Sequence, residues 1–158
     1  MAVSASSGAL SPLPNLDMLT PSPGEQLPYT ALQANDAYSI HALLSLRILT
    51  ALTSAPSSAP ILPLNSFLNI NYPPITPPCL NPAAFTFVLT RAFTVPFADN
   101  PHICGQDTLP LEWDVLNNTD SCEVSVSILD ARTKLDKGRD AQEAVVKRLE
   151  GLLGCSTA

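Results

Sequence analysis

The stretch Cys122-Glu-Val-Ser-Val-Ser-Ile-Leu129 decides the fold class of this chain. Apolar and polar residues alternate along it, with Val124, Val126 and Ile128 on one side and Glu123, Ser125 and Ser127 on the other. Because successive side chains of a strand point to opposite faces of a sheet, this alternation predicts a β-strand with one apolar face.

Three further strands are predicted upstream of it. Phe67-Leu-Asn-Ile-Asn71 alternates and is stopped by Pro73-Pro74. Phe85-Thr-Phe-Val-Leu-Thr-Arg91 is rich in β-branched and aromatic residues and lies between two prolines. A short strand near Val3 is expected to stop at Ser6-Ser7-Gly8.

Two helices are predicted between and after the strands. One begins at an N-cap at Asn35 or Asp36 and ends near Thr53. Its apolar stripe consists of Ala37, Ile40, Leu44, Ile48 and Leu52. The other covers residues 140–153, with a capping box formed by Asp140 and Glu143 and a left-handed C′ residue at Gly154. Strands that alternate with helices predict an α/β layer structure.

Composition indicates one folded domain over residues 1–158. Hydrophobic residues make up 46% of the chain and charged residues 14%, which excludes a chain that is disordered throughout. Sixteen prolines against six glycines predict an irregular Pro-rich loop over 9–33 and a Ser-, Ala- and Pro-rich linker over 54–63.

Charge and hydropathy exclude two classes of partner. A net charge of −6 with only eight lysines and arginines argues against nucleic acid and against an anionic membrane surface. The most apolar window, residues 40–52, is well short of the ~20 residues that a bilayer requires. We therefore expect neither nucleic acid nor membrane as a partner.

The four cysteines are expected to form two structural disulfides. The predicted strand rises about 23 Å at ~3.3 Å per residue, and a helix over 140–153 runs back about 20 Å at ~1.5 Å per residue. An antiparallel helix would thus return Cys155 to the edge where Cys122 lies, which predicts Cys122–Cys155 and, by elimination, Cys79–Cys104. A zinc site is the competing interpretation, but no Cys-x-x-Cys spacing is present.

Several features are typical of an oxidising compartment. The cysteines and the glycosylation sequon Asn117-Asn118-Thr119 favour a secreted or extracellular protein. Residues 1–8 have neither the basic region nor the long apolar region of a signal peptide. The combination suggests a portion of a longer protein.

A search for catalytic groups finds few candidates. The sequence has no Gly-rich phosphate loop and no Gly-x-Ser-x-Gly elbow. We interpret His41 as a structural histidine on a helix, His102 as a loop residue and Trp113 as a packed loop anchor. The acidic residues of the same region are interpreted as a solvated face rather than a metal cluster: Asp99, Asp107, Glu112, Asp114 and Asp120.

Four stretches together resemble the SurE-like family of metal-dependent phosphatases and nucleotidases. The most specific is Leu62-Pro-Leu-Asn-Ser-Phe-Leu-Asn-Ile-Asn-Tyr-Pro73, which is similar to the family's Leu-Asn-Ile-Asn-x-Pro strand. Phe87-Val-Leu-Thr-Arg91 resembles the next strand, which typically ends in Thr-Arg. Residues 1–8 and the helix from Ala37 to Leu52 resemble the strand, polar turn and helix that come before. The strand at 122–129 and the Cys155 tail are similar to the secreted fungal branch.

The resemblance implies an α/β fold with an incomplete Rossmann-like three-layer sheet that lacks its N-terminal strands. It implies hydrolysis of small phosphate monoesters with a divalent metal, Mg or Mn, in the full-length protein, and a possible homo-oligomer. The family's Asn-Asp-Asp-Gly metal-binding turn is not in this sequence. We therefore expect no catalytic or metal-ligating residue in this chain, no metal bound by it and no activity by itself, with Ser6, Ser7 and Gly8 at the pocket rim.

A rival hypothesis needs no enzymatic ancestry. Composition alone favours a secreted, disulfide-stapled binding or structural protein. The Leu-Asn-Ile-Asn-Tyr-Pro and Val-Leu-Thr-Arg stretches favour the phosphatase family over this alternative.

Overall fold

The computed structural model describes residues 37–54, 60–94, 99–119 and 121–157. This part of the chain contains three α-helices and four strands. Their order is α1 (Ala37–Ser54), β1 (Ser66–Asn71), β2 (Thr86–Thr90), α2 (Glu112–Asn117), β3 (Glu123–Asp130), α3 (Arg139–Arg148) and β4 (Leu153–Gly154). The predicted α/β class is confirmed at this level. The expected loop over 9–33 and the strand near Val3 lie outside the described residues.

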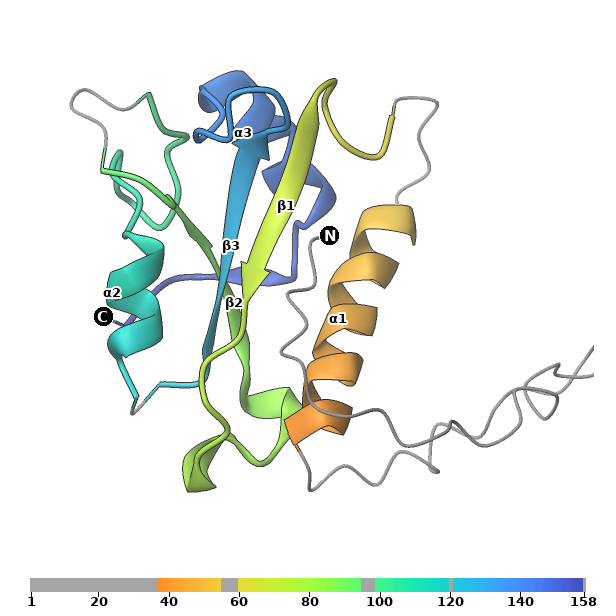
Figure 1. Cartoon of the computed structure of the whole chain (residues 1–158), viewed down its shortest axis with the longest axis vertical. Coiled ribbons are helices and arrows are strands. Elements are labelled where there is room, and N and C mark those ends of the chain that lie inside the picture. The colour runs from red at the N-terminus through yellow and green to blue at the C-terminus, as the bar shows by residue number, and fades with distance from the viewer. Residues whose placement is uncertain (1–36, 55–59, 95–98, 120, 158) are drawn as a thin grey trace, which may run out of the picture. The chain divides into compact units, whose positions relative to one another are not determined.

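The strands form one mixed sheet in the order β1-β3-β2-β4 (Figure 1). β1 runs antiparallel to β3, whereas β2 is parallel to both β3 and β4. Seven of the eight residues of β3 are buried, so this strand is covered on both faces. The predicted alternation of β3 is confirmed, because Ile128 pairs with Leu68 and Ser127 pairs with Asn69.

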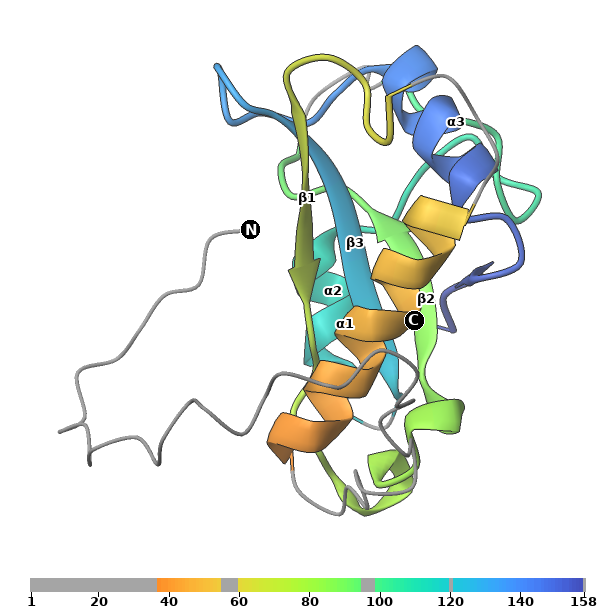
Figure 2. The same ribbon diagram turned by 90° about the vertical axis from the view of Figure 1, so that its right-hand side faces the viewer.

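Helices cover both faces of the sheet. α1 and α3 lie on one side of the strands (Figure 2), and their buried residues join the apolar face of β3 in one core. α2 lies on the opposite face (Figure 1). The four larger members of the predicted α1 stripe are buried, as is Leu43. The core is built from Ile40, Leu44, Ile48, Leu52, Phe87, Leu89, Val124, Val126, Ile128, Val145 and Leu149.

The C-terminal helix is shorter than predicted. α3 ends at Arg148, after which the N–H of Leu149 donates to the carbonyls of Val145 and Val146. Gly151, with φ +83°, is the left-handed residue, and Gly154 belongs to β4. The N-cap is Gly138 without a side-chain cap, so the predicted capping box is also wrong. The chain stops the helix early because Leu153 and Gly154 pair with the free edge of β2.

The structure corrects the predicted pairing of the cysteines. All four form disulfides, but the bonds are Cys79–Cys122 and Cys104–Cys155, with Cα–Cα distances of 5.4 and 5.6 Å. Phe87 of β2 pairs with Val124 on one side and Leu153 on the other. This register places Cys155 about 10 Å across the sheet and about 13 Å along it from Cys122, beyond the ~7 Å that a disulfide spans. The prediction failed because it lacked β4.

Two smaller expectations are also corrected. Residues 112–117 form helix α2 within the region that was interpreted as a loop. Trp113 on this helix is 73% exposed, so it is not a packed anchor. The expected linker over 54–63 is wrong at its first residue, because Ser54 still belongs to α1. The last four residues of that range, 60–63, are irregular.

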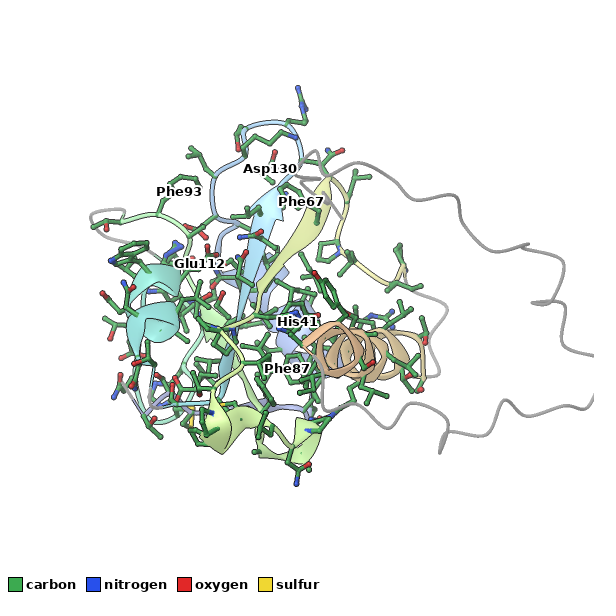
Figure 3. All side chains as sticks on the ribbon, turned by 60° about the horizontal axis from the view of Figure 1, so that its bottom comes forward. His41, Phe67, Phe87, Phe93, Glu112 and Asp130 are labelled. Carbon is green, nitrogen blue, oxygen red and sulfur yellow. A yellow bond between two sulfur atoms is a disulfide. The ribbon has the colours of Figure 1, made fainter. Side chains whose placement is uncertain are left out.

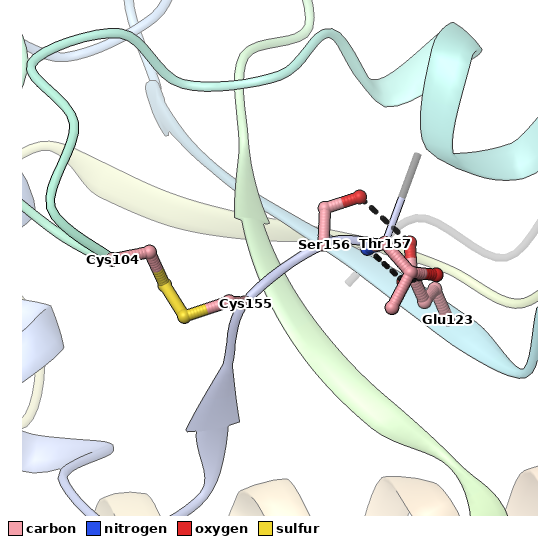
Figure 4. The surroundings of a disulfide bond; sticks show 5 residues. All are labelled: Cys104, Glu123, Cys155, Ser156 and Thr157. Atoms are coloured by element: carbon pink, nitrogen blue, oxygen red, sulfur yellow. Dashed lines mark hydrogen bonds between the residues drawn. A yellow bond between two sulfur atoms is a disulfide. The ribbon is translucent and has the colours of Figure 1, made fainter.

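The C-terminal tail is fixed by a buried carboxylate at the start of β3. Glu123 is 3% exposed, and its side chain accepts hydrogen bonds from Ser156 Oγ at 2.9 Å, Thr157 N at 2.7 Å and Thr157 Oγ1 at 2.8 Å (Figure 4). The Cys104–Cys155 disulfide lies beside this contact (Figure 4). These bonds hold the tail across β2 after β4 ends.

The close approach of β4 to β2 predicts that Gly154 cannot be enlarged. A Cβ atom at this position would lie 2.5 Å from Thr86 Cγ2, so Gly154→Ala should lower the free energy of unfolding by about 1–3 kcal/mol. Thr86→Ser removes the opposing methyl group and should restore most of the loss in the double variant. Urea unfolding measures both effects. Thr86→Ser alone is the control, because it removes the methyl group without adding a Cβ atom at residue 154; an undiminished loss in the double variant would contradict the contact.

The two disulfides should differ in their accessibility to a reductant. Cys104 and Cys155 are both exposed, whereas Cys79 is 0% exposed. Mild dithiothreitol followed by alkylation and peptide mass spectrometry should therefore modify Cys104 and Cys155 first, with Cys79 and Cys122 labelled only after unfolding. Simultaneous labelling of all four would show that burial of Cys79 does not protect its bond.

Candidate functional site

The carboxyl ends of the parallel strands β2 and β3 form the candidate site. The connection after β2 passes through α2 on one face of the sheet, and the connection after β3 passes through α3 on the other. Open α/β sheets bind their ligands where neighbouring connections leave toward opposite faces. A ligand-binding or catalytic site is therefore expected at this edge of the sheet.

A hydrogen-bonded polar cluster lies on the α2 face, at and beside this edge. Thr90, Ser127 and Asn69 lie side by side on three adjacent strands, because Ser127 pairs with both of the others. Glu112 Oε2 accepts from Asn69 Nδ2 at 2.7 Å and from Ser127 Oγ at 3.3 Å, while the Thr90 and Ser127 hydroxyls are 2.7 Å apart. Glu112 projects from α2 toward the strands (Figure 3). We call Asn69, Thr90, Glu112 and Ser127 the polar cluster.

A second carboxylate closes the end of β2. Asp136 Oδ1 accepts from Ala92 N and its Oδ2 from Phe93 N, both at 3.0 Å. Successive backbone N–H groups are a typical anion-binding arrangement. Here the anion is a side chain of the protein, so this pair of donors is not open to a ligand.

The loop after β3 is held by Asp130. Its Oδ2 accepts from Lys137 Nζ at 2.8 Å, and its Oδ1 accepts from the backbone N–H groups of Arg132 and Thr133. The Lys137 hydrogen bond, followed by the two backbone bonds, holds the pKa of Asp130 well below its usual range. This carboxylate is therefore charged and fully occupied at neutral pH.

Arg91, directly after β2, is the exception at this edge. Its side chain is buried, with the residue 6% exposed, and its Nε and Nη1 atoms have no hydrogen-bond partner. The backbone is well held, because Arg91 N donates to Pro110 O and Arg91 O accepts from Glu112 N. In the sequence, Arg91 is identifiable only as the last residue of a predicted strand. The feature of the sequence that could have indicated its role is the position of a charged residue directly after an apolar strand.

Two pockets lie near this part of the fold. One of about 270 Å³ lies between β2, β4 and the loop before α2, and Cys104 and Cys155 are among its lining residues. Its lining includes Val88, Gln106, Thr108 and Ser156. The other, of about 500 Å³, lies between α3 and residues 101–103 and is lined by side chains of both charges.

The two histidines have different surroundings. His41 is half-buried on α1 and stacks on Tyr72, with ring centroids 4.8 Å apart, while Tyr72 OH lies 2.6 Å from Ser45 Oγ. Burial lowers the pKa of His41, opposed by a hydrogen bond to the backbone of Pro73. His102 is exposed, and its Nδ1 lies 2.8 Å from Asp107 Oδ1. Neither histidine belongs to the polar cluster.

The other sequence-based candidates are spread apart. Asp99 pairs with Arg139 at 2.8 Å, and Asp114 is exposed. Asn117 is exposed at the end of α2. Ser6, Ser7, Gly8 and Asp120 lie outside the described residues. Within residues 37–54, 60–94, 99–119 and 121–157, no three His, Cys, Asp or Glu side chains gather as a metal site.

Comparison with protein-family models, with curated proteins and with solved structures finds no match to this chain. Among the described helices none is long and apolar enough to cross a bilayer. The two disulfides are consistent with a secreted or extracellular protein.

The surroundings of His41 predict a pH effect on stability. Because its pKa is lowered in the folded state, the unfolded chain binds more protons below about pH 6.5, and the free energy of unfolding should fall as the pH decreases from there. His41→Gln should lose this part of the pH dependence. Urea unfolding at pH 7.5 and 5.0 measures it, with the exposed His102→Gln as control. Parallel pH profiles for wild type and His41→Gln would contradict the assignment.

Proposed function

We propose that the chain is the C-terminal portion of a SurE-like phosphatase or nucleotidase that hydrolyses small phosphate monoesters. One observation supports this most. The two most specific stretches of the resemblance, Leu68-Asn-Ile-Asn71 and Val88-Leu-Thr-Arg91, form β1 and β2 on either side of β3. Asn69 from the first and Thr90 from the second meet in the polar cluster through Ser127 and Glu112.

The polar cluster gives a structural reason for the Leu-Asn-Ile-Asn and Val-Leu-Thr-Arg motifs to occur together in one enzyme. Each of its hydroxyl, amide and carboxylate groups bonds to another member, so the cluster fixes three strands and α2 relative to one another at the ligand-binding edge. A catalytic site needs such a rigid support, because small displacements of reacting groups cost large factors in rate. In this proposal the described residues supply the support and not the chemistry.

The divalent metal belongs to another segment in this proposal. A bound Mg or Mn ion would polarise the phosphoryl group and activate water. The described side chains do not form a ligand set for it, so no step of the reaction is assigned to them. The Asn-Asp-Asp-Gly turn of the family would hold the ion, with Ser6, Ser7 and Gly8 at the pocket rim and a small phosphate ester as the partner.

The alternative is a secreted binding or structural protein without catalysis. The observation that favours it is the pair of disulfides, which join residues 43 and 51 positions apart in the sequence. Small extracellular binding domains use such bonds to stabilise loops. The alternative does not account for the convergence of the two motif strands on the polar cluster.

Phosphatase assays on two proteins test the proposal. One is the 158-residue chain, and the other extends it with the sequence encoded directly upstream. With p-nitrophenyl phosphate or a nucleoside 5′-monophosphate and Mg or Mn, we expect turnover only in the extended protein, because only it would carry the metal-binding turn. A chelator and an extended variant with asparagines in place of the two turn aspartates should both abolish it.

Two results would contradict the proposal. Metal-dependent turnover by the 158-residue chain would overturn its expected inactivity. An upstream sequence that is an ordinary signal peptide, with no Asn-Asp-Asp-Gly, would favour the non-catalytic alternative.

A further inference from the structure

Arg91 is a buried cation without a counterion. The residue is 6% exposed, and its Nε and Nη1 are buried without a partner. Among the described residues, no hydrogen bond or ion pair involves its side chain. A buried charge is strongly unfavourable unless it is paired and hydrogen-bonded. An anionic ligand would supply the charge and the hydrogen bonds that Nε and Nη1 lack.

The neighbouring carboxylates are already occupied. The backbone N–H of Glu112 donates to the carbonyl oxygen of Arg91. The Glu112 carboxylate, however, is bonded to Asn69 and Ser127 in the polar cluster. Four other carboxylates near this end bind partners of their own, namely Asp99 with Arg139, Asp107 with His102, Asp130 with Lys137, and Asp136 with the N–H groups of Ala92 and Phe93. None of these groups is left to neutralise Arg91.

The position of Arg91 relative to α3 indicates where an anion would bind. Residues 87, 89 and 91 share one face of β2 by alternation, and Phe87 and Leu89 pack in the core with Val145 and Leu149 of α3. α3 connects the end of β3 to the start of the parallel strand β4, so it runs antiparallel to β2. Its first turn therefore lies toward the carboxyl end, where Arg91 is.

The first turn of α3 has features of an anion site. The helix has ten residues, and its N-cap Gly138 contributes no side-chain cap. Free N–H groups and the helix dipole favour an anion at such an end. Asp140 in this turn is exposed. It lies two residues from the buried Gln142 and hence on the opposite side of the helix.

We propose that Arg91 and the first turn of α3 bind a small tetrahedral oxyanion, either free phosphate or the phosphoryl group of an ester. Water alone would satisfy the hydrogen bonds of the guanidinium but leave its charge uncompensated. A hydrated oxyanion neutralises the charge, and its water supplies a donor for Gln142 Oε1, which is also buried without a partner. The inference rests on the burial of Arg91 and does not require phosphatase activity.

Thermal unfolding in phosphate tests the site on the full chain. At constant ionic strength, with chloride replacing phosphate, the midpoint of unfolding of the wild type should rise with phosphate concentration, because a ligand of the folded state stabilises it. Arg91→Met should abolish the rise, and its midpoint in chloride should equal or exceed that of the wild type. Arg132→Met, which removes an exposed arginine, should respond to phosphate as the wild type does.

Calorimetric titration separates the sources of the anion. Inorganic phosphate and a simple monoester, such as glycerol 3-phosphate, are titrated separately into the wild type; the tighter ligand identifies the source. If Arg91→Met does not fold, these titrations decide alone. Absence of binding by both ligands, or a phosphate response retained in Arg91→Met, would overturn the site. If phosphate or the monoester binds in an Arg91-dependent way and no phosphatase turnover is found, the anion site is supported. If turnover is found and anion binding does not depend on Arg91, the site is wrong and the proposed phosphatase function is unaffected.

Discussion

The pairing of β3 on both of its edges is the constraint on which the described fold depends. β1 lies antiparallel on one side and β2 parallel on the other. Backbone N–H and C=O groups that are buried must be hydrogen-bonded, and seven of eight β3 residues are buried. Displacing either neighbour would expose one row of these groups. The register also assigns every β3 side chain to a face, because a shift by one residue would exchange the two faces.

The two faces of β3 take different roles as a result. Val124, Val126 and Ile128 face α1 and α3 and form the centre of an apolar core. Ser127 faces α2 with Asn69 and Thr90, where a buried hydroxyl is acceptable because it has partners. The sheet thus separates a face that stabilises the fold from a face that organises polar groups.

Local sequence patterns predicted α1 and the strands β1, β2 and β3, but they missed α2 and β4 and placed the end of α3 too late. The stripe from Ile40 to Leu52 and the alternation from Glu123 to Ile128 extend over several periods, so α1 and β3 were predicted nearly to their ends. β4 has two residues, and α2 with six makes fewer than two helical turns, so neither shows a repeating pattern. β4 forms because β2 has an unpaired edge, and α2 forms where it packs on the second face of the sheet. Both conditions are properties of the assembled fold.

The same reasoning explains what was missed at the candidate site. The disulfide pairing failed because it depends on β4. The backbone N–H donors that bind Asp136 and the burial of Arg91 depend on residues distant in sequence, so composition and spacing give no sign of them. Thr90 and Asn69 lay in motifs that were singled out, but only the register shows that both reach Ser127.

The two covalent links also determine what a single cut in the chain can release. Their spans overlap, because Cys104 lies inside the loop closed by Cys79–Cys122, and Cys122 lies inside the loop closed by Cys104–Cys155. A protease that cleaves once anywhere between residues 79 and 155 therefore leaves the two pieces bonded together. A cut between β1 and residue 79 has no disulfide across it, so α1 and β1 then stay attached only through non-covalent contacts, among them the Asn69–Glu112 hydrogen bond.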